Sequence, residues 1–200
     1  MGTDTRINPV PTERSRSPAG TVPDIVRTPR LDLVTLELRD LEAIGSDDHG
    51  FAAAHGWHNP DGLLTGDEAW MGSMFARRLA DRPSAAGWLA RVMVERKSST
   101  IVGHIGCHHP PSHDGVVEIG YTVGASRRGE GIATEAVTGL VDALAGSGVV
   151  REVLASTSPD NLASIRVLER VGFTRVGSGD PAGLVSVSYG LDGRRPQRGA

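Results

Sequence analysis

A Gly-Glu-Gly step at residues 129–131 stands between a segment that alternates like a strand and one that repeats like a helix. Val116–Val123 precedes it as the strand, and beyond it apolar side chains recur at helical spacing from Ala136 to Leu144. The first amides of a helix are unpaired and carry partial positive charge, and glycine lets a backbone approach an anion closely. The junction therefore indicates either a cradle for a diphosphate or a tight strand-to-helix turn.

Two common phosphate-binding motifs do not fit this junction. The Walker A motif needs Gly-x4-Gly-Lys-Ser/Thr, and no Lys-Ser/Thr pair follows either glycine. The dinucleotide fingerprint needs a third glycine where Thr134 stands, and its strand opens a βαβ unit, whereas this strand closes a meander. The spacing therefore favours neither of these two nucleotide sites.

The other segments predict a mixed sheet with helices on its faces. Leu31–Leu38 alternates like a first strand, and the T-x-x-E pattern of Thr65 and Glu68 predicts a capped helix over Thr65–Asp81. The remaining expected elements are strands at Trp88–Glu95, Thr100–Cys107, Val116–Val123 and Arg151–Ser156, a helix over Asn161–Val171, and strands in FTRVG and LVSVSYG. This order predicts an α+β fold: one domain with a twisted, mixed, mostly antiparallel sheet of six to seven strands, flanked by helices.

Composition narrows the classes of protein that the chain can belong to. Its 200 residues carry a formal net charge of -3, without the basic excess of a nucleic-acid-binding protein. The single cysteine, Cys107, excludes an intramolecular disulfide, and no apolar run approaches the length of a membrane span. We therefore expect a cytoplasmic protein without a membrane contact, with flexible tails at 1–27 and 192–200 around one domain at 28–191.

Four motifs in register resemble a known family. Arg128–Ala133 matches the R/Q-x-x-G-x-G/A signature of the GNAT superfamily of acetyl-CoA-dependent N-acetyltransferases. Asn161–Phe173 is similar to the N-x-x-S-x-x-x-L-x-x-x-G-F pattern of its RimJ/RimL branch, and EIGYTV and TPRLDLVTLELRDLEA also resemble that branch. The resemblance implies direct transfer of an acetyl group from acetyl-CoA to a primary amine, on a protein N-terminus or a small molecule. It also implies a splay between the fourth and fifth strands.

The resemblance assigns a set of cofactor-binding residues. Backbone amides of residues 128–134 would hold the diphosphate, with Arg128 adding charge, and unpaired backbone at Tyr121–Val123 would bind the pantetheine arm and the developing oxyanion. Asn161 would reach the pantetheine or brace the splayed strands, or it is an ordinary helix N-cap. The full set is Tyr121, Thr122, Val123, Arg128, Gly129, Glu130, Gly131, Ile132, Ala133, Thr134, Asn161 and Ser164.

Acetyl transfer requires that the amine lose a proton and that a thiolate leave. We expect Glu118, just before the pantetheine segment, to be the base; the alternative is a carboxylate that merely faces solvent. Many members of the family have a tyrosine where this chain has Leu168. A hydroxyl from Ser156, Thr157 or Ser158 would then protonate the thiolate, or it leaves unassisted; Tyr121 is a remote alternative.

Two other functions remain open from the sequence. The missing tyrosine is also compatible with an acyl-CoA-binding module that has lost its chemistry. Five metal-binding side chains crowd one hairpin without paired ligand spacing, so a zinc site is a weaker alternative, and we expect no metal. These residues are His104, Cys107, His108, His109 and His113. Acetyl-CoA and an amine are the expected partners, and the chain is expected to be a monomer or a homodimer.

Overall fold

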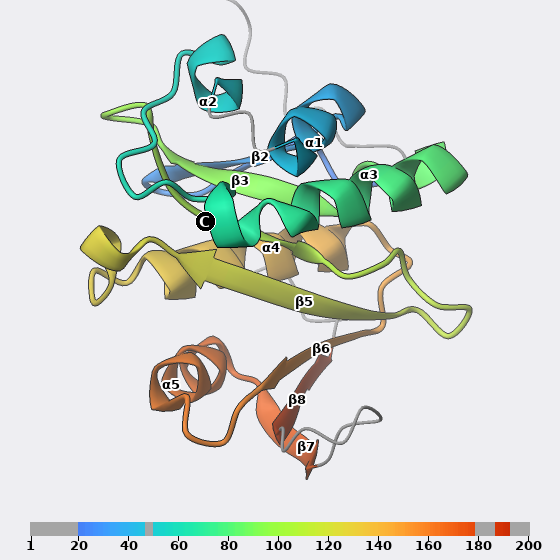
Figure 1. The fold of residues 1–200 in the computed structure, drawn as a ribbon. Helices are drawn as coiled ribbons and strands as arrows, with labels where there is room; N and C mark the ends of the chain where they lie inside the picture. The colour runs from blue at the N-terminus through green and yellow to red at the C-terminus, as the bar shows by residue number, and fades with distance from the viewer. Residues whose placement is uncertain (1–19, 47–49, 179–186, 193–200) are drawn as a thin grey trace, which may run out of the picture.

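The computed structural model describes residues 20–46, 50–178 and 187–192. These residues form an eight-stranded sheet in the order β1-β2-β3-β4-β5-β6-β8-β7, flanked by helices (Figure 1). All neighbouring strands are antiparallel except β5 and β6. The strands are β1 (Ile25–Arg27), β2 (Leu31–Thr35), β3 (Ala90–Glu95), β4 (Thr100–Cys107), β5 (Val116–Val123), β6 (Glu152–Thr157), β7 (Thr174–Ser178) and β8 (Val187–Asp192). The α-helices are α1 (Leu38–Gly45), α2 (Phe51–Ala54), α3 (Trp70–Asp81), α4 (Ile132–Gly146) and α5 (Leu162–Val171), and the 3-10 turns are Gly66–Glu68, Pro83–Ala85 and Ala125–Arg127.

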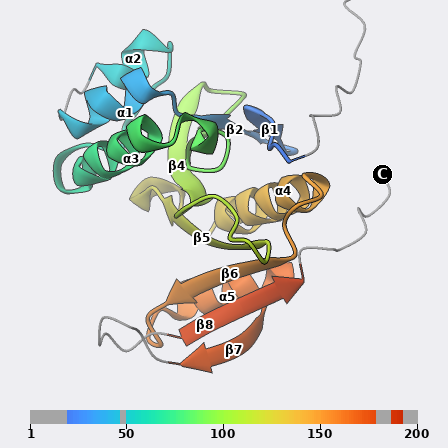
Figure 2. The same cartoon turned by 90° about the vertical axis from the view of Figure 1, so that its right-hand side faces the viewer.

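Helices cover both faces of the sheet. Figure 2 shows α4 on one face, α1 and α3 on the other, and α5 beside β6–β8. The apolar repeat of α4 supplies one hydrophobic core, in which Val137 and Leu140 pack with Val117 and Ile119 of β5. Because strand side chains alternate, Glu118, Gly120 and Thr122 of β5 point to the face that α3 covers. The two faces of β5 therefore differ: one is core, and the other carries polar groups and a glycine.

The parallel pair β5 and β6 diverges part-way along its length. Pairing runs only from Val116 with Glu152 to Glu118 with Leu154, and the strands then separate (Figure 1). On its other edge, β5 stays paired with β4 as far as Val123. The predicted splay is therefore confirmed, and its apex lies at Glu118.

Several predicted boundaries are wrong. The expected tail at 1–27 ends too late, because Val26 is buried and Ile25–Arg27 pairs with β2. This additional strand helps to raise the total to eight, above the six to seven expected. At the other end, Asp192 belongs to β8, and the other expected tail residues, 1–19 and 193–200, lie outside the described residues. Within the described part of the chain, no helix is long and apolar enough to cross a membrane.

The capped helix predicted from Thr65 is also different. Thr65 makes no side-chain cap, and its hydroxyl donates to the Gly62 carbonyl instead. A 3-10 turn follows it, and α3 begins only at Trp70, which is 63% exposed rather than on the buried face. Glu68 accepts from the Leu64 amide, so the carboxylate stabilises the preceding loop and not a helix start at Thr65.

Candidate active site

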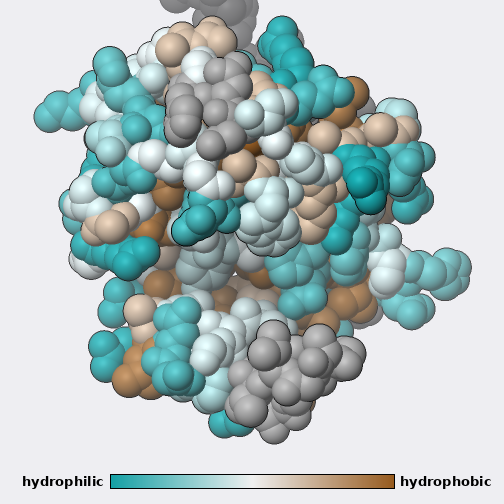
Figure 3. Space-filling model, in the orientation of Figure 1, coloured by the Kyte–Doolittle hydropathy of each residue, from teal (hydrophilic) through white to brown (hydrophobic). Residues whose placement is uncertain are grey.

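A cavity of about 520 Å³ opens where β5 and β6 diverge. Figure 3 shows the surface hollowed between the upper layers and the lower part of the molecule. The volume lies in the range of small-molecule and cofactor pockets. The lining comes from the end of β5, the loop into α4, and α5: Tyr121, Thr122, Val123, Arg127, Arg128, Gly129, Gly131, Ile132, Ala133, Thr134, Asn161, Ala163, Ser164, Arg166, Val167 and Arg170. Every residue predicted to bind the cofactor is in this lining except Glu130.

The glycine junction forms the rim of the cavity. Gly129 and Gly131 have φ values of 82° and 78°, in the left-handed region that other residues rarely adopt. Gly131 is the N-cap of α4, and no side chain caps this end of the helix. The first hydrogen bond of the helix is the one that the Gly131 carbonyl accepts from the Glu135 amide. The amides of the first turn therefore face out of the helix toward the cavity, an arrangement that suits an anion.

Glu135, in the first turn of α4, stabilises this junction through Thr28 and Arg30. Its carboxylate accepts from the Thr28 hydroxyl at 2.6 Å, the Arg30 amide at 2.7 Å and the Arg30 guanidinium at 2.6 Å. Arg30 in turn donates to the Glu130 carbonyl at 3.1 Å. Burial raises the pKa of Glu135, but these hydrogen bonds outweigh burial and hold it below its ordinary value. An ionised Glu135 thus ties the β1–β2 turn and the glycine junction to α4.

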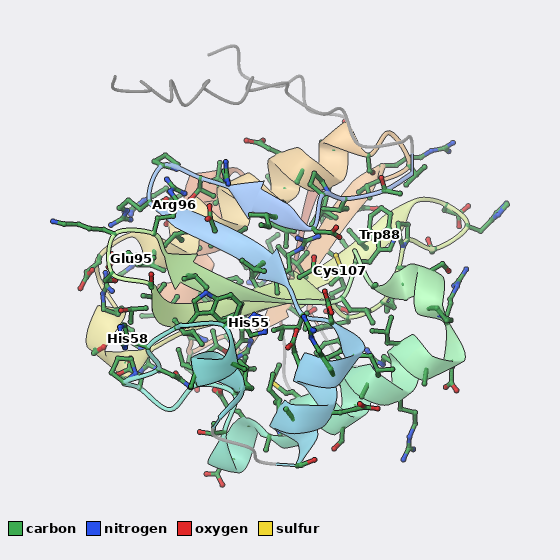
Figure 4. The ribbon with its side chains drawn as sticks, turned by 90° about the horizontal axis from the view of Figure 1, so that it is seen from above. His55, His58, Trp88, Glu95, Arg96 and Cys107 are labelled. Carbon is green, nitrogen blue, oxygen red and sulfur yellow. The ribbon has the colours of Figure 1, made fainter. Side chains whose placement is uncertain are left out.

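The side chain of Glu130 belongs to a surface ion pair instead of the cavity. It pairs with Arg127 at 3.0 Å, and Arg127 also pairs with Glu95 at 2.7 Å. The hydrogen bonds that Arg127 donates to Glu95 and, to a lesser extent, to Glu130 raise the pKa of Arg127, so it stays charged. Glu95 lies with Arg96 at the end of β3, far from Trp88 in Figure 4. Glu130 therefore contributes at most its backbone to the junction.

The edge of β5 that faces β6 is open beyond the apex. The Glu118 carbonyl accepts a hydrogen bond from the His108 amide, and the Gly124 amide donates one to the Val102 carbonyl. Both residues therefore bond toward β4. Because backbone groups alternate along a strand, those of Tyr121 and Val123 point toward β6, whereas those of Thr122 do not. The Arg128 guanidinium donates a hydrogen bond to the Val123 carbonyl at 3.2 Å, so this carbonyl already has a partner. Tyr121 is therefore the central free backbone position of the splay.

Asn161 and Ser164 close the cavity on the α5 side. Asn161 is the N-cap of α5, and its side-chain oxygen accepts from the Ser164 amide at 3.1 Å. The Ser164 hydroxyl meets the Tyr121 hydroxyl at 2.8 Å, and burial raises the pKa of this phenol. Tyr121 is thus a neutral phenol that joins β5 to α5. Asn161 is thus an N-cap that also lines the cavity, and its contact with the pantetheine stays a prediction.

Glu118 lies at the apex, on the face of β5 opposite the α4 core. Its carboxylate is 3.7 Å from His108 Nδ1, and its side chain is 31% exposed. The nearby His108 imidazole is the main cause that lowers the pKa of Glu118, partial burial opposes it, and the Ser156 hydroxyl adds to the lowering. Glu118 is therefore a carboxylate with two polar neighbours, and it is not an isolated surface charge.

The candidate proton donors differ in their surroundings. Ser156 reaches Glu118, whereas the Ser158 hydroxyl donates to Asp160 at 2.7 Å within the turn before α5. Leu168 is fully buried in the core, so the position of the family tyrosine holds a packing residue. Ser156 is therefore a predicted hydroxyl that lies beside Glu118 at the apex.

Three groups of polar residues near the splay were not among the predicted site residues. Arg166 and Arg170 of α5 line the cavity and add positive charge. His104 is nearly buried, and its Nε2 lies 3.5 Å from Glu68 Oε2 without a hydrogen-bond partner among the described residues. The nearby imidazole is the main cause that lowers the pKa of Glu68. For His108, the sequence suggests only a possible metal ligand. The last paired residues of the β4–β5 hairpin are Cys107 and Ile119, so the next residue on each strand pairs His108 with Glu118.

The zinc interpretation of this hairpin finds no support. No three His, Cys, Asp or Glu side chains gather as a metal site in the ranges that the structure describes. Burial raises the pKa of Cys107 to about 12, against the opposing charge of Arg91, so the group is a protonated thiol. Cys107 and Trp88 lie together at one end of the β3–β4 hairpin, and His58 lies at the other (Figure 4). Cys107 is a small core residue, not a nucleophile.

Comparison with known proteins identifies the family. The sequence profile of the acetyltransferase (GNAT) domain matches residues 30–174. The chain belongs to the GNAT acetyltransferase family. It is therefore an acyltransferase whose acetyl donor is acetyl-CoA, as the motifs predicted.

Individual GNAT relatives agree with this assignment. An uncharacterised N-acetyltransferase of Bacillus subtilis, YjdG, is 28% identical over 155 residues, which cover 74% of this chain and 89% of the relative. RimJ of Mycobacterium smegmatis, solved with a CoA-disulfide, superposes with a TM-score of 0.59 at 23% identity, covering 87% of this chain and 88% of RimJ. The microcin C7 self-immunity acetyltransferase MccE, solved with acetyl-CoA and AMP, superposes with a TM-score of 0.61 at 18% identity. The match covers 90% of this chain and 99% of MccE. These structures confirm the GNAT fold.

Proposed function

We propose that the cavity at the splay binds acetyl-CoA and that this GNAT enzyme acetylates a primary amine, on a protein N-terminus or a small molecule, by direct attack. One observation carries the proposal: all but one of the residues that the motifs assigned to the cofactor line a single cavity beside the α4 N-terminus. Amides of Arg128–Thr134 receive the diphosphate there, and Arg128 lies on the same rim. Arg166 and Arg170 give the opposite wall a positive charge that favours the phosphates.

The open edge of β5 orients the reacting end of the donor. The Tyr121 amide faces the splay, so it donates to the pantetheine arm or to the oxygen that gains charge during transfer. Thr122 bonds toward β4 and contributes only its side chain. Asn161 and Ser164 act indirectly, because they fix α5 and the Tyr121 ring on the other wall.

The acceptor approaches from the face of β5 that α3 covers. Glu118 and Glu68 lie on this side with lowered pKa values, so both are anions that attract a cationic amine. Acid–base chemistry takes place at the apex, beside Glu118, and the neighbouring Ser156 hydroxyl can pass a proton on to the departing sulfur. We propose that the enzyme acts in the cytoplasm, as a monomer or a homodimer.

A titration followed by a turnover assay tests this function. Isothermal calorimetry should detect binding of acetyl-CoA, with free ATP and NAD as controls that carry the phosphates without the pantetheine arm. Thiol release is then measured with peptides that begin with Ser or Ala and with small primary amines. Selective binding with thiol release supports the enzyme, binding without release from any amine favours the acyl-CoA-binding module, and no binding contradicts both.

A further inference from the structure

His108 is fixed at the apex of the splay although it lies just after β4. Its amide donates to the Glu118 carbonyl at 2.8 Å, which extends the β4–β5 ladder by one residue. Its carbonyl accepts a hydrogen bond from the Arg78 guanidinium of α3. Both backbone polar groups are therefore held, and the imidazole is placed by the sheet rather than by a free loop.

The two ring nitrogens face different surroundings. Nδ1 lies 3.7 Å from Glu118 Oε2, and catalytic contacts of this kind are often long until substrate binds. Nε2 lies over Gly120, only 2.7 Å from the point that a Cβ would occupy there. The absence of a side chain at Gly120 leaves this space to the imidazole. No described residue hydrogen-bonds Nε2, and the His108 side chain is 48% exposed, so an acceptor can reach it.

Gly120 is the second residue beyond the last paired position of β5, next to Tyr121 with its free amide. The free nitrogen of His108 therefore lies beside the backbone that orients the donor. A carboxylate that holds one nitrogen of an imidazole while the other faces the reacting group is the arrangement of a base and its orienting partner.

We propose that His108 is the catalytic base of this acetyltransferase and that Glu118 is its positioning residue; the proposal rests on the function proposed above. The amine nitrogen bonds to the acetyl carbon, and the carbon–sulfur bond breaks with its electron pair on sulfur. One proton leaves the nitrogen for His108 Nε2, which returns it to the thiolate or to water. The lowered pKa of Glu118 agrees with this division of roles, because a base works best when its pKa lies near the working pH.

The charged and titratable groups around the ring come from every neighbouring element. Glu118 of β5 faces Nδ1, Arg78 of α3 holds the backbone carbonyl, and His109 follows in the chain. His109 offers a matched control, because it is an exposed histidine one residue away whose ring bonds to the Pro110 carbonyl at 3.0 Å. A general effect of losing positive charge from this loop would follow either substitution.

The first test compares His108→Asn with His109→Asn, using the acceptor that the amine panel yields. His108→Asn should lower kcat/KM by about 100-fold, as expected for loss of a general base, and remove the acidic limb of its pH profile. Acetyl-CoA affinity and His109→Asn kinetics should stay at wild-type values. Added imidazole should partly restore the activity of His108→Ala. An unchanged acidic limb in a folded His108→Asn enzyme that still releases thiol would overturn the role of His108 and leave the acetyltransferase function standing.

The second test needs no acceptor. Long-range 1H–15N spectra of the acetyl-CoA complex report which nitrogen of the neutral His108 carries the proton. Nδ1–H is expected, since it faces Glu118, and Glu118→Gln should change this tautomer population. The Nε2–H tautomer in the wild type would contradict the proposal, even if no amine in the panel is acetylated.

Discussion

The two sides of the β5–β6 splay are built by different means. On the cavity side, most of the groups that we propose for anion binding come from one continuous stretch, Arg128–Thr134, and are backbone amides at a helix N-terminus. The acceptor side takes its groups from three elements: Glu118 from β5, Ser156 from β6, and His108 from the end of β4. Backbone recognition on one side is therefore local, whereas side-chain chemistry on the other depends on tertiary pairing.

This difference predicts how each side responds to substitution. A backbone site is altered by changes in glycine conformation and by added charge, and it is indifferent to most side chains. A side-chain site is altered when one partner loses its hydrogen bond or its space. Variants of the cavity side should therefore change binding of acetyl-CoA, and variants of the acceptor side should change turnover.

The largest effect is expected from Gly131→Asp on the cavity side. The new carboxylate would stand at the N-terminus of α4, against the diphosphate, and like charges brought together cost on the order of 3 kcal/mol. We expect acetyl-CoA affinity to fall by about 100-fold in calorimetry. The fold should survive, because an added Cβ lies 3.7 Å from its nearest neighbour, Arg30, and Asp tolerates the left-handed region better than most residues.

Gly148→Asp is the matched control for that experiment. Gly148 follows α4 at its opposite end, has a φ of 76°, and has nothing within 4 Å of an added Cβ. The same substitution there should leave acetyl-CoA affinity unchanged. Equal loss of affinity in both variants would mean that charge on α4 in general is responsible, and wild-type affinity in a folded Gly131→Asp would remove the cradle interpretation.

Glu118→Gln should produce the second-largest effect, on the acceptor side. The amide keeps the size of the side chain but no longer offers a carboxylate to His108 Nδ1, so kcat should fall by roughly 30-fold. The acetyl-CoA dissociation constant should not change, because Glu118 lies outside the cavity lining. Steady-state kinetics with calorimetry on the same preparation separate the two quantities. A loss of cofactor affinity instead would show that the two sides are not independent.

The same difference explains what the sequence could predict. The α4 junction was predictable because one short segment carries both the glycines and the helix, and the splay and the overall sheet followed from the family motifs. The helix at Thr65 was not, because a capping pattern cannot tell that Glu68 will bond to the Leu64 amide in a loop. His108 was not identified as a partner of Glu118, because that pairing depends on the register of a hairpin whose connection spans residues 108–115. Val26 was misassigned because the edge strand β1 has only three residues, and of these Val26 alone is buried.

Glu135→Gln tests how much the hydrogen bonds of Glu135 behind the cavity contribute to the free energy of unfolding. Glu135 is ionised in the fold with three hydrogen bonds, and losing its charge should cost roughly 1–3 kcal/mol of unfolding free energy. Since its pKa is lowered on folding, its contribution is complete above the ordinary value of about 4.3 and disappears as the pH falls through the folded value. Urea unfolding should therefore separate wild type and variant at pH 7 and bring them together in acid.

Glu169→Gln on α5 serves as the control for that comparison, because Glu169 is exposed and makes no ion pair within the described ranges. Its stability should equal that of the wild type across the same pH range. A Glu135→Gln protein as stable as the wild type at pH 7 would contradict the assigned role of the carboxylate.

The smallest effect is expected from Gly120→Ala, which adds one methyl group to the acceptor side and removes no ionisable group. The new Cβ would lie 2.7 Å from His108 Nε2, so the imidazole must turn away from the apex. A flexible side chain can give way, so stability should change by less than about 1 kcal/mol while kcat falls by roughly fivefold. Gly177→Ala in β7 is the control, since nothing lies within 4 Å of its added Cβ. Unaltered turnover in Gly120→Ala would mean that the position of the ring over Gly120 is irrelevant to catalysis, whereas lost cofactor affinity would mean that β5 transmits strain from one side of the splay to the other.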